Sequence, residues 1–258
     1  MMDSQAAPTT ALTTTTASKR RPWVLSLARR YARRSLHASF DGVFVNGLDN
    51  ARVVVGSRPV IFACNHVCWW DAFVLVVVDE ALGGGGHAVM DEANLRRLPF
   101  FGALGAVPIN RDGGARLRRQ IDDASRLIKR PGSSLWFFPQ GRQRAAHLRP
   151  LDLLPGLRLL ARHSGADVIP VSLSYPWREA PVPSVVVTLH PPIPAKQPDL
   201  LVAVEAAIVS GLEAHDRAID LAQDPGTALL PPQARKGAED GRGARLLARL
   251  MSDRGGSR

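Results

Sequence analysis

Short apolar runs alternate along this chain with longer stretches in which apolar residues recur every three or four positions. Short runs bounded by Gly, Pro or Asn are typical of strands, and the longer period is typical of helices that bury one side. Strands are predicted at residues 40–45, 52–55, 60–63, 87–90, 104–110, 134–138, 168–175 and 184–189. Helices are predicted at residues 22–40, 70–82, 91–98, 115–129, 151–163 and 199–221. Strands that alternate with helices predict an α/β fold.

The predicted sheet is mixed but mostly parallel, and helices flank it. Strands joined through helices become parallel neighbours, whereas two short strand–turn–strand pairs, at 40–55 and 168–189, predict other pairings. Three loops that follow strand ends carry His66, Arg111 and a Pro-Gln-Gly sequence. Where such strands are parallel neighbours, these loops meet at one edge of the sheet, where α/β folds place ligands.

The chain divides into one domain and two terminal tails. Residues 1–21 are rich in Thr, Ala and Ser without an apolar period, and we expect them to be disordered. Residues 22–222 form the domain, which includes the helix at 22–40. Residues 223–258 are polar and rich in Gly, Pro and Arg, so a flexible basic tail is expected, with one possible helix at 244–251. No segment has the uninterrupted apolar length of a membrane span.

The composition indicates the cellular compartment and argues against disulfides and a metal site. The chain has 258 residues, of which 45% are hydrophobic, enough for one sizeable core. Its two cysteines, Cys64 and Cys68, lie in one short stretch, so a disulfide framework is excluded and a cytosolic location is favoured. Cys64, His66 and Cys68 are too crowded to bind one metal ion and no distant Cys pair exists, so we expect no metal site.

The net charge indicates an anionic partner. The chain carries a formal charge of +10 and has a pI of about 10.8. Nucleic acid, an anionic membrane surface and an acyl carrier are the candidates. No nucleic-acid-binding motif or aromatic-rich pattern is visible, so the membrane surface is favoured and nucleic acid is not expected.

The predicted helix at 22–40 is basic and amphipathic. Trp23, Leu27 and Tyr31 recur at helical spacing, a pattern that suits the membrane interface. Its arginines include Arg29, Arg30, Arg33 and Arg34. Alternatively, the helix packs on the domain through its other apolar residues. One face can do each job, so we expect peripheral attachment to the cytoplasmic side of a membrane.

His66 and Asp71 lie between two of the most apolar segments of the chain, 59–63 and 72–78. Buried ionisable groups cost free energy unless they are paired. On one helix, residues five apart point about 140° away from each other, so the two side chains meet only if His66 precedes the helix. Asp71 would then fix the tautomer of the imidazole and leave its other nitrogen to take a proton. The alternative is structural: a His that caps the helix and an Asp in its first turn.

Four blocks of sequence in order resemble the glycerolipid acyltransferases, the lysophosphatidic acid acyltransferase family. Residues 64–71, Cys-Asn-His-Val-Cys-Trp-Trp-Asp, resemble its His-x-x-x-x-Asp block. Residues 105–111, Gly-Ala-Val-Pro-Ile-Asn-Arg, are similar to its second block, and 137–142, Phe-Phe-Pro-Gln-Gly-Arg, to its Phe-Pro-Glu-Gly-Thr-Arg. Residues 168–171, Val-Ile-Pro-Val, are similar to the fourth. The resemblance spans roughly residues 40–190 and is specific because the blocks occur in order.

The resemblance implies transfer of an acyl group from a thioester, acyl-CoA or acylated carrier protein, to a lipid hydroxyl. His66 would act as general base and Asp71 would orient it, with no acyl-enzyme and no cofactor beyond the acyl donor. Backbone N–H groups near Gly141 would hold the oxyanion. The residues implied to bind the acceptor are Arg111, Pro139, Gln140, Gly141, Arg142 and Arg144.

The third block departs from the family pattern. Gln140 replaces a Glu, and the family's Thr-Arg becomes Arg142-Gln143, followed by Arg144. Because forked contacts to phosphate depend on placement, this shift favours an acceptor with another head group, such as a glycolipid. The alternative is that Arg142 or Arg144 reaches the same phosphate from a new position.

Two further hypotheses come from other classes. A thioester hydrolase would use Cys68 or a water activated by His66, although a Cys in an apolar stretch is usually a small buried residue. A non-catalytic basic module that binds a membrane or nucleic acid would explain the charge and the altered third block.

Overall fold

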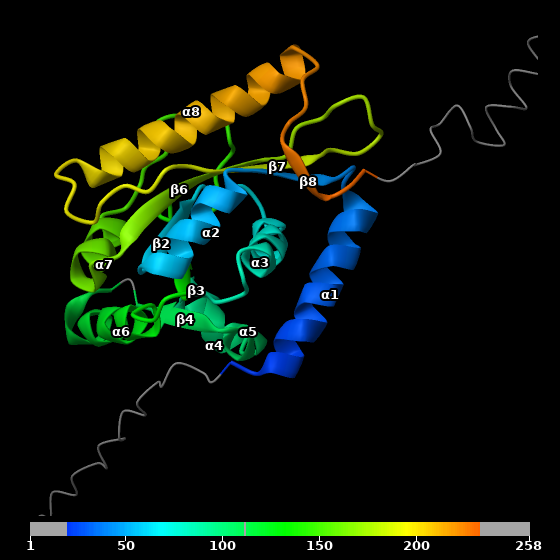
Figure 1. Ribbon diagram of the computed structural model, residues 1–258. Helices are drawn as coiled ribbons and strands as arrows, with labels where there is room; N and C mark the ends of the chain where they lie inside the picture. Colours follow the sequence, from blue (N-terminus) through cyan, green and yellow to red (C-terminus); the bar gives the residue numbers. More distant parts are fainter. Residues whose placement is uncertain (1–19, 111, 233–258) are drawn as a thin grey trace, which may run out of the picture.

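The described part of the chain, residues 20–110 and 112–232 of a computed structural model, folds around one eight-stranded sheet (Figure 1). The strands are β1 (Val43–Asn46), β2 (Val60–Cys64), β3 (Gly86–Asp91), β4 (Ala106–Ile109), β5 (Ser134–Phe137), β6 (Asp167–Ser174), β7 (Val185–Leu189) and β8 (Thr227–Leu230). Their order is β4-β3-β5-β2-β6-β7-β1-β8. Of the pairs formed by these eight strands in the described residues, only β6–β7 and β1–β8 are antiparallel. The predicted mixed, mostly parallel α/β fold is therefore confirmed.

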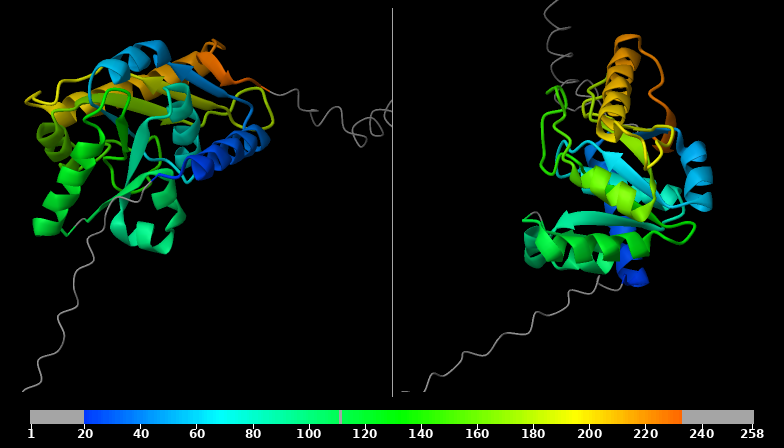
Figure 2. Two further views of the ribbon diagram at one scale, coloured as in Figure 1. Left: turned by 60° about the horizontal axis from the view of Figure 1, so that its bottom comes forward. Right: turned by 90° about the vertical axis from the view of Figure 1, so that its left-hand side faces the viewer.

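Helices cover both faces of this sheet (Figures 1 and 2). They are α1 (Pro22–Ser39), α2 (Leu48–Ser57), α3 (Asp71–Ala81), α4 (Glu92–Arg97), α5 (Phe100–Leu104), α6 (Gly114–Leu127), α7 (Gly156–Ser164) and α8 (Leu200–Asp220). One core joins α1, α2 and α3 to the first face of the sheet, and a second joins α6, α7 and α8 to the other. In β2, Phe62 enters the first core and Ile61 the second, which explains its uninterrupted apolar run.

One predicted strand is wrong, because residues 52–55 lie inside α2. Their β-branched valines favoured a strand. Ala51 and Val55, four positions apart, are buried while Val53 is 73% exposed, which is the period of a helix. Gly47, at φ +76°, lets the chain turn from β1 directly into α2. Packing of this one apolar face therefore overrides local propensity.

Antiparallel pairing arises at 168–189 as predicted, in β6 and β7, but not at 40–55. The other antiparallel pair involves β8, which lies in the segment expected to be a flexible tail. Asn46 at the end of β1 donates a hydrogen bond to the carbonyl of Pro225 (2.8 Å) and helps to fix this strand. The fold therefore continues past residue 222 to Leu230.

One helix prediction is confirmed, and another is correct only in its second half. The helix at 70–82 is confirmed as α3 despite its run of three valines, because both sides of the helix meet apolar neighbours. The helix predicted at 151–163 begins only at Gly156. The backbone N–H of Leu151 donates instead to Glu205 of α8 (2.6 Å), and residues 151–154 form a loop.

Several predictions lie outside the described residues. They are the disordered segment up to residue 19, the helix at 244–251 and the phosphate contact of Arg111.

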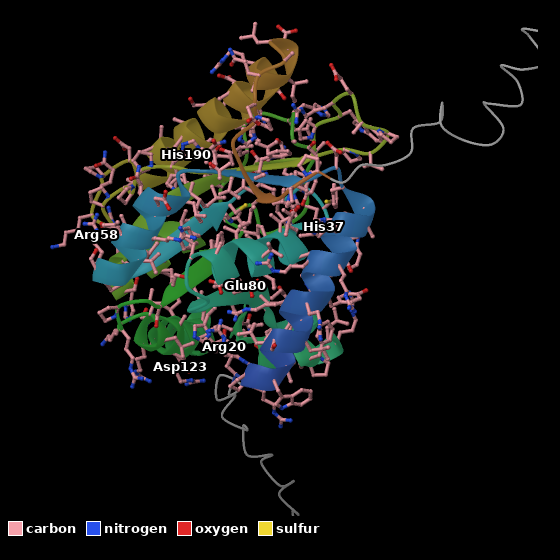
Figure 3. All side chains as sticks on the ribbon, turned by 45° about the vertical axis from the view of Figure 1, so that its right-hand side comes forward. Arg20, His37, Arg58, Glu80, Asp123 and His190 are labelled. Atoms are coloured by element: carbon pink, nitrogen blue, oxygen red, sulfur yellow. The ribbon has the colours of Figure 1, made fainter. Side chains whose placement is uncertain are left out.

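Two histidines lie where α8 packs on the sheet, His215 on α8 itself and His190 just after β7. His215 is 4% exposed and lies between Ser174 and Thr188, with 2.8 Å from a ring nitrogen to each hydroxyl. His190, labelled in Figure 3, lies 2.8 Å from the Ser172 hydroxyl. Burial lowers the pKa of His190, and burial followed by the neighbouring His190 lowers the pKa of His215 to about 4. Both histidines are therefore neutral in the folded protein at pH 7.

Acid should destabilise the fold through these histidines. In the unfolded chain a His titrates near pH 6.5, so the unfolded state binds more protons below that pH and the free energy of unfolding falls. For His215 the loss begins near pH 6.5 and is complete below its folded pKa of about 4. Its size is about 2 kcal/mol at pH 5. Urea unfolding at pH 7 and pH 5 gives the free energy of unfolding at each pH. The decrease from pH 7 to pH 5 should be smaller in His215→Gln than in wild type, and equal decreases would contradict the role of His215 in acid destabilisation.

Candidate active site

The site is built where β2 ends and α3 begins. β2 ends at Cys64, the loop carries His66, and Asp71 is the first residue of α3. His66 Nδ1 lies 2.5 Å from Asp71 Oδ2. The side chain of His66 is 22% exposed and that of Asp71 is 0% exposed. This is the loop-to-helix placement that the five-residue spacing requires.

Asp71 is held by donors from three directions besides His66. Its Oδ2 accepts from the backbone N–H groups of Val67 (2.7 Å) and Cys68 (3.1 Å). Its Oδ1 accepts from the Tyr175 hydroxyl (2.6 Å). Burial and then the neighbouring carboxylate raise the pKa of Tyr175, so this hydroxyl stays a donor. These contacts compensate the buried carboxylate and fix its orientation.

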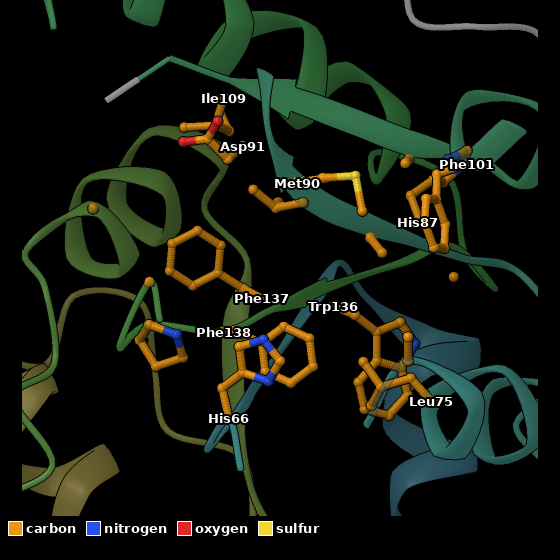
Figure 4. A pocket seen from close by; sticks show the side chains of 18 of the residues that line it. His66, Leu75, His87, Met90, Asp91, Phe101, Ile109, Trp136, Phe137 and Phe138 are labelled. Atoms are coloured by element: carbon orange, nitrogen blue, oxygen red, sulfur yellow. The ribbon is translucent and has the colours of Figure 1, made fainter. Parts of the chain in front are cut away.

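The arrangement suits proton transfer at His66 Nε2. With Nδ1–H assigned as the donor to Asp71, Nε2 carries the lone pair. The ring stacks on Phe138, with centroids 4.1 Å apart and planes 18° apart. Figure 4 shows this pair in the pocket, on the other side from His87 and Phe101. A His so oriented can take a proton from a hydroxyl and hold it as an imidazolium beside the carboxylate.

A cavity of about 830 Å³ opens in front of His66. It forms because β3 leaves β5 after Ala88 and continues beside β4 to Asp91. The residues that line it fall into two groups, one toward each face of the sheet, and each group is here called an arm. The first, here called the α3 arm, is lined by Ala72, Leu75, Val76, Ala88, Met90 and Trp136. The second, the α7 arm, is lined by Leu117, Phe137, Pro155, Arg158, Leu159 and Arg162.

The α3 arm ends at a polar group. Arg20, Asp79 and His87 line the cavity there. Asp79 accepts from the indole N–H of Trp136 (3.2 Å), and Arg20 donates to the carbonyl of Gly84 (3.1 Å). Burial raises the pKa of Asp79, and it lowers that of Arg20. Arg20 and His87 bond to backbone carbonyls and Asp79 bonds to Trp136, so these polar groups close the apolar arm.

A family model described as Acyltransferase matches residues 42–174, just over half of the 258-residue chain. The chain belongs to the glycerolipid acyltransferase family. No curated protein with which the chain was compared matches it. The matched segment begins before β1 and ends with β6, so it contains His66, Asp71 and the third block.

Gln140 of this acyltransferase holds the backbone on both sides of the site. Its Oε1 accepts from the backbone N–H of His66 (2.7 Å), and its Nε2 donates to the carbonyl of Leu151 (3.1 Å). The side chain is buried, with 6% exposure of the residue. Both polar ends are therefore engaged, and Gln140 fits a residue that positions His66 rather than one that contacts an acceptor.

Restoring the family's carboxylate at this position should destabilise the protein. In Gln140→Glu an ionised oxygen would face the carbonyl of Leu151 and lose a donor, at a cost of about 1–3 kcal/mol. The exposed neighbour Gln143 offers a matched control, Gln143→Glu, which should have little effect. Urea unfolding should show a larger loss at pH 8 than at pH 5, because a protonated Glu can still donate. Wild-type stability of Gln140→Glu at pH 8 would contradict this role.

The arginines of the third block are directed away from the cavity. Arg144 lies 2.6 Å from Asp152 Oδ2, and its side chain is 14% exposed. The same guanidinium donates to the carbonyl of Pro150 (2.9 Å). The backbone N–H of Arg144 donates to the carbonyl of His66 (2.8 Å). Arg142 is 70% exposed and 3.9 Å from the same carboxylate. Neither arginine lines the cavity, so the expected acceptor contacts are not assembled here.

Pro139 and Gly141 do line the cavity. Gly141 adopts φ +66°, a conformation that glycine allows at little cost. Its backbone N–H donates to the carbonyl of Phe138 (3.0 Å) within the turn. That N–H is therefore engaged and does not form the expected oxyanion contact.

Sequence reasoning did not find Tyr175 or Asn65. Tyr175 lies just after β6 and reaches Asp71 from 104 residues away. Asn65 is 2% exposed, and its amide donates to the carbonyl and accepts from the N–H of Leu173. Asn65 thus extends the β2–β6 pairing by one residue and brings Tyr175 toward Asp71. The signal in the sequence was an Asn directly beside His66.

Cys68 is poorly suited to act as a nucleophile. Its sulfur lies 3.6 Å from Asp71 Oδ1. Burial and then the Asp71 carboxylate raise the pKa of the Cys68 thiol, which keeps it protonated. Among residues 20–110 and 112–232, no group of three or more His, Cys, Asp or Glu side chains is arranged to hold a metal ion.

Proposed function

We propose that this acyltransferase moves a fatty acyl group from acyl-CoA or acyl carrier protein to a lipid hydroxyl. The observation that carries the proposal is the 2.5 Å contact between His66 and the fully buried Asp71, beside an apolar cavity. The acceptor would be lysophosphatidic acid or a related lysophospholipid or glycolipid. No cofactor beyond the acyl donor takes part in this proposal.

In the proposed reaction, His66 Nε2 takes the proton of the acceptor hydroxyl as its oxygen attacks the thioester carbonyl. The tetrahedral intermediate then collapses, the carbon–sulfur bond breaks, and the imidazolium returns the proton to the leaving sulfur. Asp71 stabilises the imidazolium between these steps, with Tyr175 and the loop N–H groups holding the carboxylate. The acyl chain would occupy the apolar α3 arm of the cavity.

We also propose that α1 attaches the protein to the cytoplasmic surface of a membrane. Trp23, Leu27 and Tyr31 are 66%, 61% and 61% exposed along one side of the helix. The ring of Tyr31 packs near Phe73 (5.9 Å), which in turn packs on the exposed Trp69 (4.7 Å). An exposed aromatic surface next to exposed arginines suits an anionic interface. No helix in the described part of the chain is long and apolar enough to cross a membrane.

The arginines of α1 divide into two groups. Arg33 pairs with Glu80 of α3 (2.8 Å), and Figure 3 shows Glu80 next to α1. Arg29 donates to the carbonyl of Gly84 (3.3 Å). Arg30 and Arg34 are exposed, which leaves them available to a membrane. One side of α1 thus packs on the domain, and the other side is exposed.

Removing the two exposed charges should release the protein from anionic vesicles. Each basic residue near such a surface contributes about 1 kcal/mol, so Arg30→Gln/Arg34→Gln should weaken partitioning about 30-fold. Sedimentation with phosphatidylserine vesicles measures the effect, and high salt should reduce it. Arg118→Gln/Arg119→Gln on α6, across the sheet, is the control with equal charge loss. Equal binding by the two double variants would contradict attachment through α1.

A lipid acceptor panel tests the proposed reaction. Purified protein is incubated with palmitoyl-CoA and, in separate reactions, lysophosphatidic acid, other lysophospholipids, a glycolipid or no acceptor, and ester products are measured by mass spectrometry. Ester formation with at least one acceptor supports transfer and would end the hypothesis of a non-catalytic module. Free fatty acid as the main product in every reaction would contradict the proposal and favour hydrolysis.

A further inference from the structure

The helix α7 presents two arginines to the same cavity as His66. Arg158 and Arg162 are four positions apart, so they lie on one face of the helix, with Leu159 beside them. All three line the cavity. The opposite face is buried in the second core through Leu157 and Leu160, which fixes the rotation of the helix. The two guanidinium groups are therefore held toward the cavity by the packing of α7.

The position of α7 is itself fastened to its neighbour. Asp122 Oδ1 of α6 lies 2.5 Å from His163 Nε2 of α7. The two helices are neighbours in Figure 1 and contact each other. Leu117 of α6 lines the α7 arm across from the arginines. The α7 arm therefore lies beside two helices that pack in the same core.

These two arginines differ from the others near the site. Arg144 bonds to Asp152 and to backbone, and Arg20 bonds to backbone at the far end of the other arm. Arg158 and Arg162 have no ion-pair partner among residues 20–110 and 112–232, and both are exposed on the side of the cavity. Among the described residues, Arg158 and Arg162 are the arginines that line the α7 arm.

The cavity is therefore electrically asymmetric about His66. The α3 arm is apolar until it is closed by its polar end, and the α7 arm carries two positive charges. The cavity wall also includes Asp91, whose Oδ1 accepts from the backbone N–H of Ala93 in α4 (2.8 Å). A substrate with an acyl chain and a phosphate matches that asymmetry. Guanidinium groups bind phosphate oxygens through forked, charge-assisted hydrogen bonds.

We propose that Arg158 and Arg162 bind a phosphate group of a substrate in the α7 arm. The proposal rests on the proposed acyl transfer and assigns the phosphate to α7 instead of the third block. Two substrates can supply that phosphate: a lysophospholipid acceptor through its head group, or acyl-CoA through its nucleotide portion.

Binding in a protein that cannot turn over separates this site from the reaction. The full-length His66→Ala protein is combined with Arg158→Gln/Arg162→Gln or, as the control of equal charge, with Arg118→Gln/Arg119→Gln on the exposed side of α6. Dissociation constants are measured by calorimetry for palmitoyl-CoA, for lysophosphatidic acid and for the phosphate-free monoacylglycerol. Each is measured below the concentration at which the lipid forms micelles.

We expect the α7 double variant to weaken binding of at least one phosphate-bearing ligand about tenfold or more, with monoacylglycerol unchanged. Loss for palmitoyl-CoA alone assigns the phosphate to the donor, and loss for lysophosphatidic acid alone assigns it to the acceptor. Losses no larger than in the α6 control, or equal losses for monoacylglycerol, would overturn the proposal. Because His66 is absent from all these proteins, that outcome is independent of whether the wild type transfers acyl groups.

Discussion

Replacing His66 with alanine should reduce acyl transfer about 10²–10⁴-fold, the usual contribution of a positioned general base. The ring lies 2.5 Å from a carboxylate that three other donors hold in place, so its removal takes away a proton acceptor whose orientation is fixed at the cavity. Initial rates of thioester consumption with a lipid acceptor measure this effect. The residual rate would come from holding both substrates together.

The fold should survive the His66→Ala change, because the side chain packs at the cavity wall rather than in either core. His147→Ala supplies a matched control, since His147 is exposed and does not line the cavity. We expect His147→Ala to act like wild type. A rate within about threefold of wild type for His66→Ala would contradict the assigned role of the imidazole.

Replacing Asp71 with asparagine should lower the rate by a similar factor and also weaken the fold. An amide cannot stabilise the imidazolium as a carboxylate does, and it favours the wrong imidazole tautomer. Its nitrogen must also face one of the donors now bound to the carboxylate, from Val67, Cys68 or Tyr175. One unsatisfied buried donor costs about 1–3 kcal/mol.

The two effects of Asp71→Asn separate experimentally. Urea unfolding gives the change in stability, and the rate per folded molecule gives the change in catalysis. Tyr175→Phe serves as the comparison, because it removes one hydrogen bond from Asp71 and keeps the His66 contact. We expect its rate to lie between those of wild type and Asp71→Asn. A folded Asp71→Asn protein with the wild-type rate would contradict the role of the carboxylate.

The geometry of the His66–Asp71 pair could be predicted because it depends on neighbouring residues. An apolar strand ending at Cys64 and a helix beginning near Asp71 leave His66 only one place, the intervening loop. The strand was recognisable because both of its faces are buried, which makes the whole run apolar.

The errors have a common physical origin in contacts between residues far apart in sequence. Residues 52–55 form a helix because the sheet buries Ala51 and Val55, and Thr227–Leu230 forms a strand because β1 offers an open edge. No local pattern contains that information. The sequence motif placed Gln140 among the acceptor contacts, but its role follows from the carbonyl of Leu151, which only the folded loop brings near.

Contacts between distant residues also decide which arginines face the cavity. The shifted third block favoured an acceptor with another head group, with a phosphate contact from Arg142 or Arg144 as the alternative. Arg144 forms an ion pair with Asp152 at 2.6 Å. Arg158 and Arg162 lie on the same face of α7 and line the cavity. The α7 helix was predicted, but which of its faces meets the cavity depends on how it packs against α6 and α8.

The dependence of thioester consumption on acceptor concentration tests the central claim most directly. With wild-type protein and palmitoyl-CoA, the rate should rise with the concentration of an active lipid acceptor, with one ester formed for each thiol released. Without acceptor, thiol release should fall to the level of the His66→Ala protein. Thiol release that continues undiminished without acceptor, with free fatty acid as product, would contradict acyl transfer to a lipid hydroxyl.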